Sequence, residues 1–254
     1  MRLSRAFVPA ILALTLCAAT IPAPSVAAVS IGISVGFAPP PLPIYDQPVI
    51  PGPGYVWMPG YWAYGPNGYY WVPGTWVLPP GIGLLWTPPW WGWNGTIYLF
   101  HVGYWGPRVG YYGGINYGFG YFGSGFVGGR WDRGRFFYNR EVNNFGNRSI
   151  TNVYSTTVTR PEPNRVSFAG GVGGIGGQPN ADEQAAARDR HRQPTGLQTQ
   201  HFSTARSNPA LRSTTNNGQP PIVTTNRAGR FNNAGVVGGR PEKGSRGGPP
   251  KPRG

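Results

Sequence analysis

Few side chains in this 254-residue sequence have the types and spacing that acid–base chemistry needs. The histidines His101, His191 and His201 are dispersed, and the two acids that a hairpin could bring together are Asp132 and Glu141. General acid–base catalysis usually needs two positioned titratable groups, and Asp132 is better explained as a turn residue. His, Asp and Glu form no cluster at the spacing of metal ligands. We therefore expect no catalytic residue, no metal site and no cofactor.

Two stretches resemble ligand-binding sequences. The glycine-rich run 170–177 lacks the lysine of a phosphate-binding loop and has no strand–helix context. The run 129–140 combines arginine, glycine and aromatic residues, as single-strand nucleic-acid binders do. The export predicted below makes nucleic acid an unexpected partner, and anionic envelope polymers would satisfy the same electrostatics. A solvated basic segment is the simpler alternative.

The most regular chemical groups are tryptophans in the pattern Trp-x-x-Gly-x-Trp. Four copies begin at Trp57, Trp71, Trp86 and Phe100, at steps of 14, 15 and 14 residues. Aromatic faces could stack on sugar rings, but a module with few Leu and Ile must build its core from them, so we favour packing. The packing or stacking residues are Trp57, Trp62, Trp71, Trp76, Trp86, Trp91, Phe100, Trp105 and Trp131.

Turn signals about every seven residues leave room only for short strands between them. Those within the repeats are Pro59, Gly60, Pro73, Gly74 and Gly103. A type II turn at Pro-Gly would set the two tryptophans of one copy side by side, although a bulge or a corner is the alternative. The architecture predicted is mainly β, an antiparallel meander of short strands.

Asn-Gly pairs predict hairpins between the repeats. Asn-Gly is the preferred centre of a two-residue hairpin loop, because both residues tolerate positive φ. With 67–68 at the centre, Tyr64 faces Trp71, and Trp62, Tyr64, Tyr69 and Trp71 share one face. A second hairpin is predicted at 94–95, and the different spacing of the two turns requires that one loop be longer or bulged.

The N-terminus predicts export. Two arginines precede an apolar stretch over 6–19, and small residues before 27–28 suit a signal peptidase, so residues 1–28 are predicted to be a signal peptide. The only cysteine, Cys17, lies inside it, so the mature chain has no disulfide. No transmembrane segment is expected after its removal. Residues 29–54 are predicted to hold a strand and a proline-rich leader.

Charge divides the mature chain. Residues 29–129 contain one acid and one base, whereas residues 130–254 contain 19 bases and 7 acids. The aromatic repeat module is placed at 55–168. Residues 169–254 are predicted to be a largely disordered, flexible basic tail, with short helices near 181–191 and 196–207 that begin at capping boxes.

The repeats, with the later stretches 111–121 and 128–131, resemble the bacterial exported YXWGXW-repeat (WXXGXW-repeat) proteins. The sequence departs from the pattern at Pro89 and Phe100. The resemblance implies an exported protein of the periplasm or cell surface, of unassigned activity and without catalytic residues. We expect a structural or interaction role, with envelope polysaccharide or another envelope protein as partner. The alternatives are a glycan-binding module that uses exposed Trp and Tyr faces, and anionic-polymer binding through the arginine-rich tail.

Overall fold

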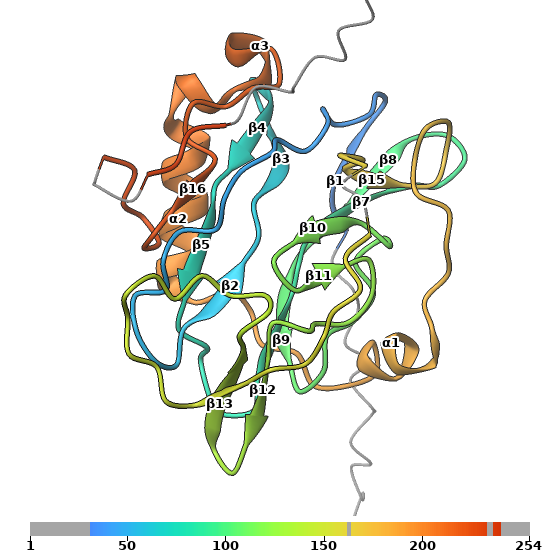
Figure 1. Cartoon of the computed structure of the whole chain (residues 1–254). Coiled ribbons are helices and arrows are strands. Elements are labelled where there is room, and N and C mark those ends of the chain that lie inside the picture. Colours follow the sequence, from blue (N-terminus) through green and yellow to red (C-terminus); the bar gives the residue numbers. More distant parts are fainter. Residues whose placement is uncertain (1–30, 162–163, 233–235, 240–254) are drawn as a thin grey trace, which may run out of the picture.

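The computed structural model describes residues 31–161, 164–232 and 236–239. The predicted signal peptide at 1–28 and the end of the predicted tail, 240–254, lie outside these ranges. Within them the mainly β class is confirmed, because most elements are short strands joined in small sheets (Figure 1). None of the described helices is long and apolar enough to cross a membrane.

The strand predicted near residue 29 is β1 (Ile31–Val35), and eight strands form the repeat region. They are β2 (Val56–Met58), β3 (Tyr61–Gly65), β4 (Gly68–Val72), β5 (Gly74–Val77), β6 (Leu85–Thr87), β7 (Trp90–Trp93), β8 (Tyr98–His101) and β9 (Tyr104–Gly106). The later strands are β10 (Asn116–Gly118), β11 (Tyr121–Phe122), β12 (Gly129–Asp132), β13 (Arg135–Asn139), β14 (Val153–Tyr154), β15 (Phe168–Ala169) and β16 (Thr224–Thr225). The helices are α1 (Ala181–Ala186), α2 (Gly196–Ser207) and α3 (Ser213–Asn216), with a 3₁₀ turn at Pro209–Leu211.

Strands β2 to β5 and β6 to β9 form two bent hairpins of the same design. At the tip of each, the inner strands pair, β3 with β4 and β7 with β8. At the base, the outer strands pair, β2 with β5 and β6 with β9. Tip and base belong to different sheets, so each arm of a hairpin turns a corner between them. The copies of the repeat therefore pair with one another across the hairpin.

The pairing of two tryptophans within one copy, which a type II turn predicts, is wrong. Such a turn needs positive φ at its glycine, and neither Gly60 nor Gly74 has it. Type II turns also match the twist of paired strands poorly. The alternative that Pro59-Gly60 and Pro73-Gly74 are corners is the one the strand pairing confirms.

The first hairpin has the predicted faces but a register that differs by two residues. Trp62 lies opposite Trp71, and Gly65 opposite Gly68, so the loop is Pro66-Asn67. Only Gly68 has positive φ (89°), whereas a two-residue Asn-Gly loop would need it at Asn67 as well. The second loop is longer, as required: it spans 94–97, between the paired residues Trp93 and Tyr98.

The described residues beyond 168 pack on the repeat module, which differs from the predicted flexible tail. Strand β15 pairs in parallel with β7, and β16 pairs in parallel with β5. Helices α1 and α2 begin at the predicted capping boxes, with Asn180 and Thr195 as N-caps, although α1 ends at Ala186. In Figure 1 the C-terminal segments, drawn in orange and red, lie along β4 and β5.

Candidate functional site

The repeat tryptophans form the core of the molecule. Trp57, Trp62, Trp71, Trp76, Trp86, Trp91 and Trp105 are each at most 2% exposed, Phe100 is 8% exposed, and Trp131 is half-buried. The corner residues Pro59, Gly60, Pro73, Gly74 and Gly103 are buried with them. Because so little of the seven tryptophans reaches solvent, the repeat itself presents no stacking platform for a sugar ring.

In the first hairpin each tryptophan packs on a tryptophan of the other copy. The ring centroids of Trp57 and Trp76 are 5.2 Å apart at an interplanar angle of 68°. Those of Trp62 and Trp71 are 5.3 Å apart at 67°. Edge-to-face pairs of this kind contribute roughly 0.5–1.5 kcal/mol each beyond the area they bury.

The glycine of each copy makes room for the tryptophan of the other. A Cβ atom on Gly60 would overlap the Trp71 indole and lie 2.9 Å from the backbone nitrogen of Gly74. A Cβ atom on Gly74 would lie 2.7 Å from Cζ2 of Trp57. The two corners therefore cross in close contact, which explains why the repeat needs glycine at this position.

The two departures from the repeat fall at facing positions of the second hairpin. By the correspondence between the hairpins, Pro89 occupies the place of Gly60, and Phe100 the place of Trp71. Because the Phe100 ring is smaller than an indole, it leaves room for the proline ring at position 89. Pro89 and Phe100 line the same small cavity. Gly103 keeps its role, since a Cβ atom on it would lie 2.5 Å from Cζ2 of Trp86.

The proline-rich leader accepts hydrogen bonds from two of the buried indoles. Nε1 of Trp62 donates to the carbonyl oxygen of Pro41 at 3.1 Å, and Nε1 of Trp76 to that of Pro48 at 2.9 Å. A proline offers a carbonyl acceptor but no N–H donor, so such a leader can cover the core without leaving a donor unpaired.

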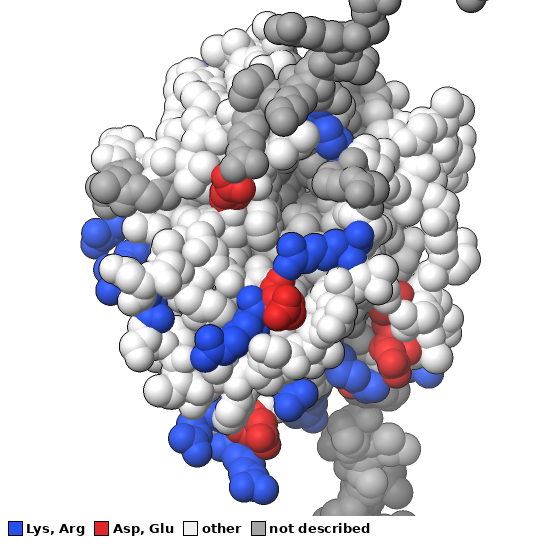
Figure 2. Space-filling model, in the orientation of Figure 1, with Lys and Arg blue, Asp and Glu red and all other residues white. Residues whose placement is uncertain are grey.

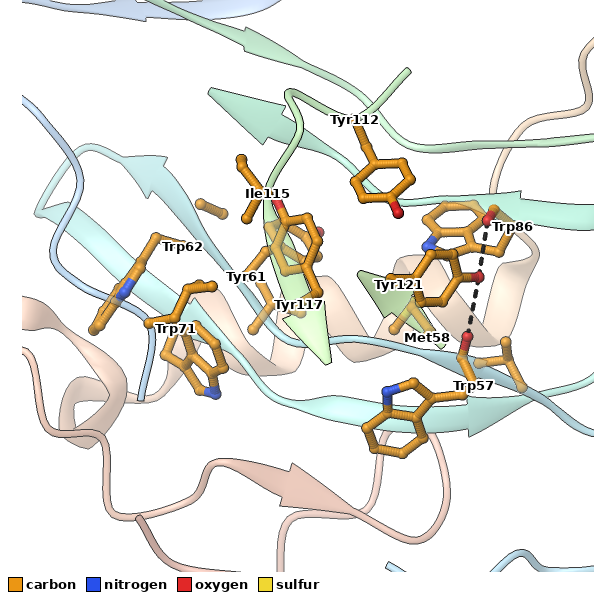
Figure 3. Packing of buried hydrophobic residues seen from close by; sticks show 14 of the residues in the cluster. Trp57, Met58, Tyr61, Trp62, Trp71, Trp86, Tyr112, Ile115, Tyr117 and Tyr121 are labelled. Atoms are coloured by element: carbon orange, nitrogen blue, oxygen red, sulfur yellow. Dashed lines mark hydrogen bonds between the residues drawn. The ribbon is translucent and has the colours of Figure 1, made fainter. Parts of the chain in front are cut away.

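The two hairpins meet at Tyr121. Its hydroxyl lies 2.8 Å from the carbonyl oxygen of Trp86 and 3.4 Å from that of Trp57, the same position in each hairpin (Figure 3). Burial raises the pKa of the Tyr121 phenol well above its usual value. Strand β11 therefore joins the halves through one neutral phenol.

Helix α2 docks through buried polar side chains, because it has no wide apolar stripe. Gln198 Oε1 accepts a hydrogen bond from Nε1 of Trp105 at 2.8 Å. His201 Nε2 lies 2.8 Å from the carbonyl oxygen of Pro73, while its Nδ1 accepts from the backbone N–H of Gly229 at 2.9 Å. Burial lowers the pKa of His201 to about 4, so the ring is neutral at pH 7.

The residue before the second tryptophan of each copy faces away from the paired tryptophans. In the first hairpin these residues are covered: Tyr61 packs on Phe202 of α2, and Thr75 bonds to Thr225 of β16. In the second hairpin they are Trp90 and Tyr104, both half-buried. Helix α1 lies over them and leaves a cleft, which we call the Trp90 cleft.

The Trp90 cleft has a volume of about 410 Å³ and combines aromatic walls with polar groups. It is lined by Thr87, Pro88, Trp90, His101, Val102, Tyr104, Tyr111, Pro179, Glu183, Gln184, Ala187 and Arg188. The sequence analysis did not identify Trp90 and Tyr104 as site residues. The signal that could have found them is that an aromatic residue directly precedes both Trp91 and Trp105.

Stacking fixes the aromatic wall of the cleft. Trp90 stacks on His101 with ring centroids 3.9 Å apart and planes 4° from parallel. Tyr104 stacks on His191 at 3.7 Å. Burial lowers the pKa of His101 and raises that of the Tyr104 phenol, so both groups are neutral at pH 7. A rigid, uncharged aromatic surface results.

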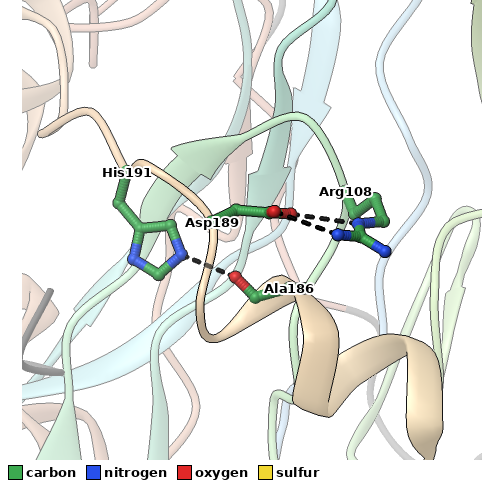
Figure 4. Close-up of polar contacts among 4 residues, drawn as sticks. All are labelled: Arg108, Ala186, Asp189 and His191. Atoms are coloured by element: carbon green, nitrogen blue, oxygen red, sulfur yellow. Dashed lines mark hydrogen bonds and ion pairs between the residues drawn. The ribbon is translucent and has the colours of Figure 1, made fainter. Parts of the chain in front are cut away.

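The opposite wall, α1, is clamped to the second hairpin (Figure 4). Arg108 forms an exposed two-bond ion pair with Asp189, with both N–O distances 3.0 Å, and His191 Nε2 lies 2.9 Å from the carbonyl oxygen of Ala186. Backbone hydrogen bonds join Trp105 and Arg192 in both directions. The cleft is therefore preformed.

The titratable residues considered for catalysis in the sequence analysis do not form a common site. Asp132 is exposed next to the hairpin tip of β12 and β13, opposite Arg135. His201 is enclosed in the core, and Glu141 is exposed. Glu183, which the sequence analysis did not consider, accepts hydrogen bonds through both carboxylate oxygens, from Ser124 and from Asn180. No group of three His, Cys, Asp or Glu side chains in the described ranges is placed to hold a metal ion.

Together these features define a class of protein: a β fold whose core is a paired tryptophan–glycine repeat. The family model of the WXXGXW repeat matches residues 52–77 in two copies, so this stretch is a WXXGXW repeat, as the resemblance implied. The matched copies are the two that form the first bent hairpin. Comparison with curated proteins and with solved structures finds no match.

Proposed function

We propose that this chain is an exported protein of the bacterial envelope with a non-catalytic binding role, and that the Trp90 cleft holds a sugar ring of an envelope polysaccharide. The predicted signal peptide supports export. The cleft itself is the observation that carries the binding role. Ligand sites combine an apolar or aromatic body with a few placed polar groups, and the Trp90 cleft has both.

The chemistry of the cleft suits an uncharged saccharide. Trp90, Tyr104 and Tyr111 offer flat surfaces for the apolar face of a pyranose ring. Gln184 and Arg188 are exposed on and just after α1, where their amide and guanidinium groups can bond sugar hydroxyls. The repeat tryptophans contribute the rigid support and make no contact with the ligand.

Isothermal titration calorimetry with triacetylchitotriose, cellotriose and maltotriose tests this role. We expect saturable binding of at least one trisaccharide, weakened about tenfold in the double variant Gln184→Ala, Arg188→Ala. Arg190→Ala is the matched control, because Arg190 is exposed in the same segment but does not line the cleft. Absence of saturable binding, or equal weakening in the control, overturns the saccharide assignment. Turnover of any trisaccharide would overturn the non-catalytic role.

A further inference from the structure

The loop 78–84, which joins the two bent hairpins, presents apolar side chains to solvent. Its sequence is Leu-Pro-Pro-Gly-Ile-Gly-Leu, so no side chain in it carries a charge or a hydrogen-bonding group. Ile82 is 72% exposed and Leu78 is 50% exposed. Exposed apolar side chains that cluster, rather than occur singly, mark surfaces that contact another molecule or a membrane. The loop is therefore a candidate docking surface.

The loop is held against the tip of the hairpin that β12 and β13 form. Trp131 Nε1 donates a hydrogen bond to the carbonyl oxygen of Leu84 at 2.9 Å. Cγ2 of Ile82 lies 4.0 Å from the position that a Cβ atom on Gly134 would take. This hairpin projects from the body of the protein (Figure 1). The exposed loop and the hairpin tip therefore form one protruding end of the molecule.

Basic side chains flank the loop at this end. Residues 130–135 contain three arginines and one aspartate, a net charge of +2. Arg133 lies at the tip of the hairpin and Arg135 on β13, and both are exposed. Figure 2 shows basic side chains gathered here around one acidic side chain. We call the loop 78–84 together with residues 130–135 the apolar tip. Its charge favours an anionic partner.

The backbone of the loop suits the head-group region of a bilayer. Pro79 and Pro80 have no N–H that would lose its water there, and the carbonyl oxygen of Leu84 already accepts a hydrogen bond. An irregular loop cannot enter the hydrocarbon core, because its remaining backbone groups would be unsatisfied, so insertion would stop among the head groups. Trp131, half-buried beside the loop, is a residue type that is enriched at this interface.

We propose that the apolar tip docks on the surface of an anionic lipid bilayer, with Leu78 and Ile82 among the head groups and Arg133 and Arg135 on lipid phosphates. Binding of this kind combines burial of apolar side chains with electrostatic attraction to anionic lipid. The net positive charge disfavours a second copy of this chain as the occupant, because two apolar tips would repel each other. None of these residues lines the Trp90 cleft, so the two sites are separate.

A fluorescent label at position 82 tests the insertion directly. In the full chain the only cysteine is first replaced, Cys17→Ser, and Ile82→Cys is then labelled with an environment-sensitive nitrobenzoxadiazole dye. Vesicles of phosphatidylcholine with about 30% phosphatidylglycerol should raise the emission of the dye and shift it to shorter wavelength. Val172→Cys is the control and should give no shift, because Val172 is fully exposed in another loop.

Three results of the labelling experiment would overturn the proposal. The first is that the emission from position 82 does not change, and the second is that the label at position 172 shifts equally. The third is that the label at position 82 shifts without vesicles as the protein concentration rises, which would show that a second copy of the chain covers the apolar tip.

Vesicle sedimentation of unlabelled variants separates the apolar part from the electrostatic part. Ile82→Asp should weaken binding to the anionic vesicles about tenfold, and Arg133→Gln combined with Arg135→Gln should weaken it by a similar factor. Val172→Asp is the matched control, because it makes the same change of charge at an exposed apolar residue, and it should leave the affinity unchanged. Circular dichroism establishes that each variant is folded.

The sedimentation results can contradict either part. Equal weakening by Ile82→Asp and Val172→Asp overturns the role of the loop. Unchanged binding of the double arginine variant, or equal binding of the native chain to vesicles of phosphatidylcholine alone, overturns the preference for an anionic surface.

Discussion

Replacing Gly60 by alanine puts a methyl group where the corners of two repeat copies cross. The new Cβ atom would overlap the Trp71 indole and lie 2.9 Å from the backbone nitrogen of Gly74. Trp71 is fully buried and Gly74 N is backbone, so neither can move at low cost. Overpacking of a core costs about 1–3 kcal/mol, and we expect Gly60→Ala to fall at the upper end. For a chain of this length that loss lowers the melting temperature by about 5–10 °C.

A double-mutant cycle shows whether the cost arises at this contact. Trp71→Phe removes the outer indole ring that meets the new methyl group. The second hairpin already combines a larger residue at the glycine position, Pro89, with phenylalanine at the facing tryptophan position, Phe100. Trp71→Phe alone should cost about 2–3 kcal/mol, because it leaves a cavity and removes the hydrogen bond to Val223. Combined with Gly60→Ala, the total should be at least about 1 kcal/mol less than the sum.

Urea unfolding followed by far-ultraviolet circular dichroism measures these free energies. Two controls accompany the cycle. Gly60→Ala combined with Trp57→Phe should be additive, because the Trp57 indole packs on Gly74 instead. Gly52→Ala should change stability by less than about 1 kcal/mol, since a Cβ atom there meets no atom within 4 Å. A neutral Gly60→Ala, or additive energies in the Trp71 cycle, would refute the crossed-corner packing.

Gln198→Leu leaves the buried N–H of Trp105 without its acceptor and should lower the free energy of unfolding by about 2 kcal/mol in urea titrations. The control Thr199→Ala, at an exposed neighbouring position, should change it by less than about 0.5 kcal/mol. Equal effects of the two variants would contradict the docking of α2. The pKa of His201 is about 4 in the folded chain, against a usual 6.5, so the unfolded chain takes up the proton first as the pH falls. Relative to His201→Gln, the free energy of unfolding of the native chain should be constant above pH 6.5 and fall by about 3 kcal/mol by pH 4. If the two proteins lose stability in parallel over this range, the low pKa of His201 is contradicted. Burial raises the pKa of the Tyr117 and Tyr121 phenols, so a spectrophotometric titration should show these two ionising only when alkali unfolds the protein. Ionisation of all 14 tyrosines near pH 10 in a folded chain would show that these phenols are not buried.

The sequence was informative where the signal was local. The period of 14 and 15 residues, the alternation of Trp62, Tyr64, Tyr69 and Trp71 on one face, and the capping boxes of α1 and α2 all depend on residues close together in the chain. The assignment of Asp132 to a turn was also local: it lies next to the hairpin tip Arg133-Gly134, where both residues have the positive φ that a two-residue loop requires.

The pairing partners were not local, and the sequence could not specify them. Pro59-Gly60 is compatible with a turn or with a corner, and only the close crossing with Gly74 decides between them. The docking of the segment beyond residue 168 depends on Gln198 and His201, polar residues whose partners lie 93 and 128 positions away. A search for an apolar stripe on the helix misses this docking, because hydrogen bonds to buried indole and carbonyl groups take the place of apolar contacts.

The same limit applies to the sites. The Trp90 cleft exists because α1 lies over the second hairpin, whereas α2 and β16 cover the equivalent face of the first. Nothing in the alternation along β7 or β9 says which face stays open.

The pairing of repeat copies across each hairpin is tested most directly by nuclear Overhauser contacts between assigned tryptophan rings. The structure predicts contacts between Trp57 and Trp76 and between Trp62 and Trp71, whose centroids lie 5.2 and 5.3 Å apart. Contacts between Trp57 and Trp62 and between Trp71 and Trp76, with none across the copies, would show that each repeat pairs with itself and would contradict the account.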